Sequence, residues 1–139
     1  MNHDMKQCEN QVTLFFRHLD ERRYDALVAL LASDAVWHRQ GKVLEGPSAV
    51  HAALMQRSAT MKIAHIITNL VFDEYETERC AMRGYMLVVR HEPGVEICKP
   101  SPLTGIESIR NMHIKMKRDA GHWLITELNG EDIIFALNA

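Results

Sequence analysis

The order of hydrophobic patterns along the chain predicts an α+β fold, in which three N-terminal helices pack on a curved, mainly antiparallel sheet. Apolar residues recur with helical spacing in the first part of the chain, up to about residue 56. From residue 63 onward the pattern is that of strands only, separated by polar or glycine-containing turns. Helices followed by a run of strands are typical of α+β proteins. With 47% apolar residues, the 139-residue chain is expected to form one domain over residues 1–139.

Three helices are predicted before the sheet. The first covers residues 7–19, where the apolar positions follow the i, i+3, i+4, i+7 spacing of an amphipathic helix. These positions are Val12, Phe15, Phe16 and Leu19. After a charged break, a shorter helix is expected over residues 24–31. Gly46-Pro47-Ser48 marks the start of the third, because proline is tolerated in the first turn of a helix, and it runs to about residue 56.

The strands are predicted from β-branched residues and from the alternation of polar and apolar side chains. They are expected at residues 35–40, 43–45, 63–72, 79–91, 106–117 and 122–128, with 133–137 extending or closing the last one. Gly41-Lys42 makes a tight reversal between the first two strands. Residues 92–105, which contain three prolines and two glycines, form the most irregular segment.

The predicted strand over residues 63–72 carries polar residues on an apolar face. Because side chains alternate along a strand, His65 and Asn69 are expected on one face with three apolar residues. Such a face is typical of a pocket floor, and also of a core with two hydrogen-bonded polar groups. In a pocket, burial would disfavour the charged imidazolium and leave His65 as a general base. Asn69 would then donate to a substrate oxygen, or else bond a neighbouring backbone group.

Two other predicted strands offer substrate-binding candidates. Alternation places Trp37 with Arg39 and His38 with Gln40, and the sequence does not decide which pair faces the cavity. An inward Arg39 would bind a carboxylate or an enolate, whereas an outward one, which the sequence favours, would be solvated or at an interface. Trp37 is expected in the core rather than as a ligand platform. Tyr85 is either a proton donor in the pocket or a packed residue with its hydroxyl at the sheet edge.

Composition excludes several classes of function. A net charge of -2 without a Lys/Arg cluster argues against nucleic-acid binding. No apolar run is long enough to span a membrane, and the N-terminus lacks the apolar core of a secretion signal. Three cysteines without a CxxC motif are typical of free thiols, so a cytoplasmic location is expected.

Eight histidines raise the question of a metal site. There is no HxH, no HExxH and no cluster of cysteine and histidine at zinc spacing, so no metal is expected. A site assembled from His38, His65 and His113 on distant strands stays an open alternative.

Four stretches of sequence carry a resemblance to a known family. They are Asp34-Ala35-Val36-Trp37-His38-Arg39-Gln40-Gly41, Glu45-Gly46, His65-Ile66-Ile67-Thr68-Asn69 and Gly121-His122-Trp123-Leu124-Ile125. In these the chain resembles the SnoaL-like branch of the nuclear transport factor 2-like superfamily over nearly its whole length. The resemblance implies a cone-shaped α+β barrel with a mostly apolar pocket for a small organic molecule. It also implies a homodimer formed through the outer face of the sheet.

The same resemblance implies candidate catalytic residues but leaves the reaction open, since members include cyclases, isomerases, dehydratases and binding proteins. In scytalone dehydratase-like members a histidine on the strand after the third helix is the general base, held by an aspartate from the first helix. His65 matches that histidine. An ungapped match puts Arg17 at the aspartate position, with Asp20 one turn later. The tyrosine typical of ketosteroid isomerase-like members reads as Phe15 here, so that constellation is absent.

Two functions follow as hypotheses. The first is cofactor-free acid–base catalysis of isomerase, dehydratase or cyclase type, with His65 as base. Tyr85, Asn69 or Arg39 would stabilise the charge that develops on oxygen. The second is a binding or assembly module that holds a small hydrophobic molecule without converting it, and the arginine at the aspartate position favours this alternative.

Overall fold

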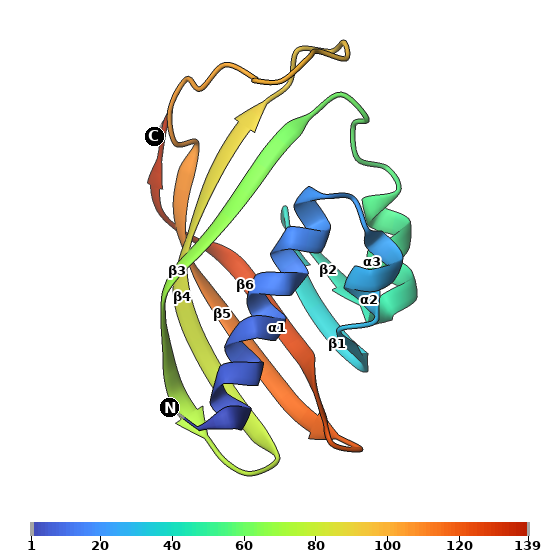
Figure 1. Ribbon diagram of the computed structural model, residues 1–139, viewed down its shortest axis with the longest axis vertical. Helices are drawn as coiled ribbons and strands as arrows, with labels where there is room; N and C mark the ends of the chain where they lie inside the picture. The colour runs from blue at the N-terminus through green and yellow to red at the C-terminus, as the bar shows by residue number, and fades with distance from the viewer. Residues whose placement is uncertain (1, 139) are drawn as a thin grey trace.

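The computed structural model describes residues 2–138, which form three helices and a six-stranded sheet. The elements are α1 (His3–Asp20), α2 (Tyr24–Val28), β1 (Leu31–Arg39), β2 (Lys42–Glu45), α3 (Gly46–Leu54), β3 (Lys62–Tyr75), β4 (Arg79–His91), β5 (Ser108–Asp119) and β6 (His122–Ala136). Figure 1 shows α1 lying across the hollow of the curved sheet, with α2 and α3 beside β1 and β2. The predicted α+β class is confirmed. None of the helices within the described residues is long and apolar enough to cross a membrane.

The strand order is β2-β1-β6-β5-β4-β3, and only β1 and β6 run parallel. This parallel pair brings the first strand of the chain against the last. It also corrects the expected end of the second helix, because α2 stops at Val28 and Leu31 already belongs to β1. Leu31 pairs with Ile125 of β6, and the amide of Ile125 donates to the Leu30 carbonyl at 2.9 Å. Tertiary pairing has overridden the local helical pattern there.

The core lies between the concave face of the sheet and α1. The apolar stripe predicted for α1 is confirmed, since all four of its side chains are at most 2% exposed. Phe15 packs edge-on against Trp37 of β1, with ring centroids 5.2 Å apart. Trp37 itself is 5% exposed, so the expectation that it belongs to the core is confirmed. Fully burying each such side chain contributes about 1.5–3 kcal/mol, which holds α1 against the sheet.

A β-bulge in β3 changes which residues face the core. Between the pairs Thr68–Tyr85 and Val71–Arg83, β3 contains one residue more than β4. Asn69 is this additional residue. Its φ of +54° is a left-handed conformation, which asparagine tolerates better than most residues. The half-buried apolar side chains of β3 therefore change from odd to even positions, from Ile63 and Ile67 before the bulge to Leu70 and Phe72 after it. A second register shift, between Phe72 and Glu74, restores the odd position at Tyr75.

Because of the bulge, the prediction that Asn69 shares a face with His65 is wrong. Asn69 is exposed instead of sharing a face with His65. The close approach of β4 at this point requires a glycine. A Cβ on Gly84 would lie 3.0 Å from the Thr68 carbonyl oxygen and 2.8 Å from Leu70 Cδ2.

Candidate functional site

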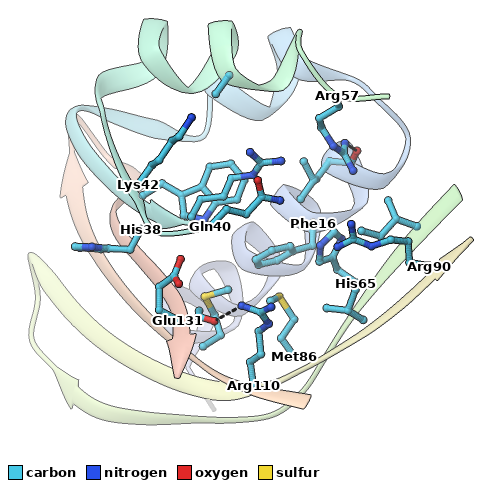
Figure 2. Close-up of a pocket in the computed structure, with 18 of the residues that line it drawn as sticks. Phe16, His38, Gln40, Lys42, Arg57, His65, Met86, Arg90, Arg110 and Glu131 are labelled. Atoms are coloured by element: carbon cyan, nitrogen blue, oxygen red, sulfur yellow. Dashed lines mark hydrogen bonds between the residues drawn. The ribbon is translucent and has the colours of Figure 1, made fainter. Parts of the chain in front are cut away.

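A cavity of about 380 Å³ lies between the concave face of the sheet and the helices (Figure 2). Its apolar wall is built from α1, β1, β4 and β5. These residues include Phe16, Leu19, Trp37, Met86, Val88 and Met112. The resemblance implied a mostly apolar pocket, and this expectation holds only for the apolar wall. Charged side chains occupy much of the remaining lining.

His65 and Asp20 form a hydrogen-bonded pair at the edge of this cavity. Nδ1 of His65 lies 2.6 Å from one carboxylate oxygen of Asp20, and the backbone N–H of His65 donates to the other oxygen at 2.8 Å. The two side chains are only 11% and 15% exposed. The ring of Phe16 lies 5.5 Å from the imidazole, centroid to centroid. The carboxylate therefore fixes both the position and the orientation of the histidine.

The pair also sets where the ring proton is held. A carboxylate can only accept hydrogen bonds, so Nδ1 is the protonated nitrogen of a neutral His65 ring. Within residues 2–138 Nε2 of His65 makes no hydrogen bond to the protein. Because it is not one of the buried nitrogen and oxygen atoms without a partner, it is accessible. Since His65 lines the cavity, Nε2 presents its lone pair to whatever occupies that space.

Asp20, not the residue at the ungapped position, is the acidic partner. Arg17 is 67% exposed and pairs with Glu21 at 2.7 Å on the solvent side of α1. Asp20 follows Phe16 by four residues, which places both on the helix face that meets β3. This spacing was a signal in the sequence, because an acidic residue there continues a buried stripe.

The strand β1 places its polar candidates around the cavity. Arg39 lines the cavity with its guanidinium 5.5 Å from the ring of Trp37, so the favoured outward orientation was wrong. The expected choice between two pairs was also too simple, since His38 and Gln40 contribute to the lining as well. Gln40 lies beyond the end of β1 with φ of +53°, where strict alternation no longer holds. Figure 2 shows the ring of His38 directed away from the centre of the cavity.

Tyr85 does not reach the cavity. It is 42% exposed and lies on the outer face of β4, while its neighbours Gly84 and Met86 are buried on the inner face. The prediction that Tyr85 donates a proton beside His65 is therefore wrong, because its side chain lies on the other face of the sheet. Asn69 is likewise absent from the cavity lining, because the bulge exposes it.

Most of the cationic side chains of the cavity were not among the residues predicted from the sequence. Five cationic side chains line it: Arg39, Lys42, Arg57, Arg90 and Arg110. Figure 2 shows Arg57, Arg90 and Arg110 entering from different sides. Two of them lie on strands, at positions where the alternation of inward and outward side chains predicts an inward side chain. Arg90 follows the buried Met86 and Val88 on β4, and Arg110 precedes the buried Met112 on β5.

These arginines differ in how their donors are used. Arg57 donates to the Leu19 carbonyl at 2.8 Å and to the Tyr24 hydroxyl at 2.9 Å. Arg90 pairs with Glu107 at 3.0 Å. Burial is the main cause that lowers the pKa of Arg39, and the charge of Arg57 lowers it further. Arg39 is thus a partly desolvated cation next to another cation.

The described residues contain no group of three or more His, Cys, Asp and Glu side chains placed to hold a metal ion. The alternative site of His38, His65 and His113 therefore does not form in the structure. His113 is 51% exposed and lies 4.0 Å from Asp132. His65 is instead bonded to Asp20.

Comparisons with known proteins identify the family and the fold. The family model of the SnoaL-like domain matches residues 2–129. No curated protein matches the chain in sequence. An NTF2-like protein with a cystatin-like fold from Novosphingobium aromaticivorans has a similar structure, with a TM-score of 0.76 at 14% identity, covering 98% of this chain and 86% of that chain. A protein of unknown function from Nostoc punctiforme, also with a cystatin-like fold, has a TM-score of 0.80 at 14% identity, covering 100% and 98%.

A provisionally named scytalone dehydratase from Novosphingobium aromaticivorans is a third similar structure. Its TM-score is 0.73 at 18% identity, and the match covers 91% of this chain and 81% of that chain. At such low identity these three likenesses establish the fold alone. They leave the chemistry to be argued from the side chains.

Proposed function

The chain belongs to the SnoaL-like domain family, and on that premise we propose that it is a cofactor-free acid–base catalyst acting on a small carbonyl compound. The observation that carries the proposal is the Asp20–His65 pair, 2.6 Å between Oδ1 and Nδ1, on the wall of a cavity. A base oriented by a carboxylate is a recurring arrangement for proton transfer. His65 is the general base and Asp20 is its positioning residue.

The proposed reaction begins with proton transfer from carbon to Nε2 of His65. The electron pair of the broken C–H bond forms a carbon–carbon double bond, and the adjacent carbonyl oxygen takes up the negative charge. The protonated imidazole is stabilised by Asp20 and then returns the proton. Return to another carbon gives isomerisation, and return to a departing hydroxyl group gives dehydration with release of water. The cationic side chains of the cavity favour the charged oxygen in either case.

The alternative of a binding or assembly module loses its main support. That alternative was favoured by Arg17 at the aspartate position, whereas Asp20 supplies the carboxylate. A module that only holds a ligand does not need a base whose free nitrogen is open to the cavity. The pair therefore supports catalysis over binding alone.

Hydrogen–deuterium exchange tests the proposal without knowledge of the product. The protein is incubated in D2O with 2-tetralone and with 4-oxo-4-phenylbutanoate, and loss of the α-proton signals is followed by NMR. We expect His65→Gln to slow protein-catalysed exchange by about 10²–10⁴-fold, the usual contribution of a general base. His113→Gln is the matched control, since that side chain is 51% exposed and lies away from the cavity. Equal exchange rates in both variants would refute the role of His65.

We also propose a homodimer through the outer face of the sheet, as the resemblance implied. Large apolar side chains on the outer side of β3 and β4 support it, since Ile66 is 47% and Tyr85 42% exposed. Native mass spectrometry at micromolar concentration measures the oligomeric state directly.

A further inference from the structure

The charge of the cavity differs from the charge of the chain. The whole protein carries a net charge of -2. In contrast, the cavity lining holds five lysine and arginine side chains and two carboxylates, Glu107 and Glu131. Even when Asp20 behind His65 is added, cations outnumber carboxylates five to three. The excess is therefore a property of this site, because the overall composition is slightly acidic.

Most of these cations are not neutralised by a neighbouring carboxylate. Arg90 is paired with Glu107 at 3.0 Å. Nη1 of Arg57 donates to a carbonyl and a phenol, and Arg110 donates to the Gly130 carbonyl at 3.0 Å and the Ser108 hydroxyl at 3.3 Å. These acceptors are neutral, so they satisfy hydrogen bonds but leave the positive charge uncompensated.

Of these cations, Arg39 has the most N–H donors without a protein acceptor. Within the described part of the chain its guanidinium makes no hydrogen bond and no ion pair, and its one aromatic contact is the face of Trp37 at 5.5 Å. This contact with the ring uses none of the guanidinium N–H groups, so they stay available to bind a carboxylate in bidentate fashion. A half-buried cation with free donors beside the cationic Arg57 favours an anionic partner.

We propose that the cavity selects an organic carboxylate, with Arg39 binding the carboxylate group and the apolar wall binding the rest of the molecule. This inference rests on the proposed function, because it names the substrate class of the same site. The carboxylate anchors the substrate so that its carbonyl-bearing segment lies against His65. A neutral ketone of the same shape would leave Arg39 without a partner and would bind more weakly.

The test compares an acid with its uncharged isostere. The ligands are 4-oxo-4-phenylbutanoate and its primary amide, and binding is followed by fluorescence of Trp37, which lines the cavity. We expect the acid to bind at least about tenfold more tightly than the amide, as a charge-assisted bidentate contact would provide. Arg39→Gln should bring the acid-to-amide ratio close to one, mainly by weakening the acid. Arg39→Lys keeps the charge and should retain part of the preference.

Arg83→Gln is the matched control, because Arg83 is exposed and pairs with Asp73 at 2.9 Å outside the cavity. It should leave the ratio unchanged. A wild-type ratio near one, including failure of the acid to bind measurably, overturns the proposal. So does a ratio that survives in Arg39→Gln, after circular dichroism has shown that the variant is folded.

The same ligand pair separates this inference from the proposed function. If the acid binds preferentially but its α-protons are not exchanged, the catalytic proposal fails and the carboxylate specificity stands. If acid and amide are bound and exchanged equally, catalysis by His65 stands and the specificity fails. Binding measured in His65→Gln should keep the acid preference, because the imidazole is not the carboxylate-binding group.

Discussion

Replacing Asp20 in two different ways should separate its structural contribution from its chemical one. In Asp20→Ala, both hydrogen bonds to His65 are lost, at 2.6 and 2.8 Å, and the backbone N–H of His65 is left without a partner. Hydrogen bonds to a charged group contribute about 1.5–3 kcal/mol each, and their effects overlap at one site. We therefore expect the free energy of unfolding to fall by about 2–4 kcal/mol.

Asp20→Asn should destabilise the protein much less but change the proton on His65. The amide oxygen can still accept from the backbone N–H, so the expected loss is about 1 kcal/mol. The amide NH2 then faces Nδ1 and donates to it, which moves the ring proton of the neutral imidazole to Nε2. Nε2 would no longer offer a lone pair to the cavity. Proton exchange should therefore be lost although the fold is kept.

Two measurements check these outcomes. Urea denaturation followed by tryptophan fluorescence gives the free energies of unfolding, and long-range 1H–15N NMR of the histidine rings gives the tautomer. Asp73→Asn is a suitable control, because Asp73 is 42% exposed in its pair with Arg83 and surface ion pairs contribute about 0–1 kcal/mol. The reasoning is refuted if Asp20→Ala is no more destabilising than this control. It is equally refuted if Asp20→Asn keeps the proton on Nδ1.

Three further predictions concern the frame of the site. Gly84→Ala should destabilise the protein by about 1–3 kcal/mol in urea denaturation, because the added Cβ meets the backbone carbonyl of Thr68 at 3.0 Å, and wild-type stability would contradict the close approach. Asn69→Val should cost about 1–2 kcal/mol in the same assay, whereas Asn69→Gly should be nearly neutral, because only the first forces a β-branched residue to a φ of +54°. A thiol reagent should label Cys98 alone in the folded protein, since the other two cysteines are buried. All three cysteines should react only in denaturant. Rapid labelling of a second thiol would show that the core is open.

Several features of the site follow from local periodicity. The stripe of α1 from Val12 to Leu19 was readable as a 3.6-residue repeat, and it is buried as expected. On β4 the alternation from Met82 to Arg90 runs without a break. Its continuation places Arg90 in the cavity. Such patterns are local because each side chain's direction depends on its own helix or strand.

Other features depend on contacts between elements that are distant in sequence. The bulge at Asn69 reverses the facing of β3, and it depends on how closely β4 approaches at Gly84. A glycine within a strand was the one available hint. The inward orientation of Arg39 follows from the face of β1 that packs on α1, where Phe15 meets Trp37. Alternation alone could not choose between the two faces of that strand.

The sequence by itself therefore determined the order of the elements, the α+β class and the candidacy of His65. Periodicity and turn residues are encoded within a few positions of the chain, so these could be predicted. Only the tertiary structure decided that Asp20 is the partner of His65, 45 residues away, and that cations gather around the cavity. Both depend on how α1 docks on the sheet and on the curvature that brings β1, β4 and β5 around one space, and no single segment specifies either.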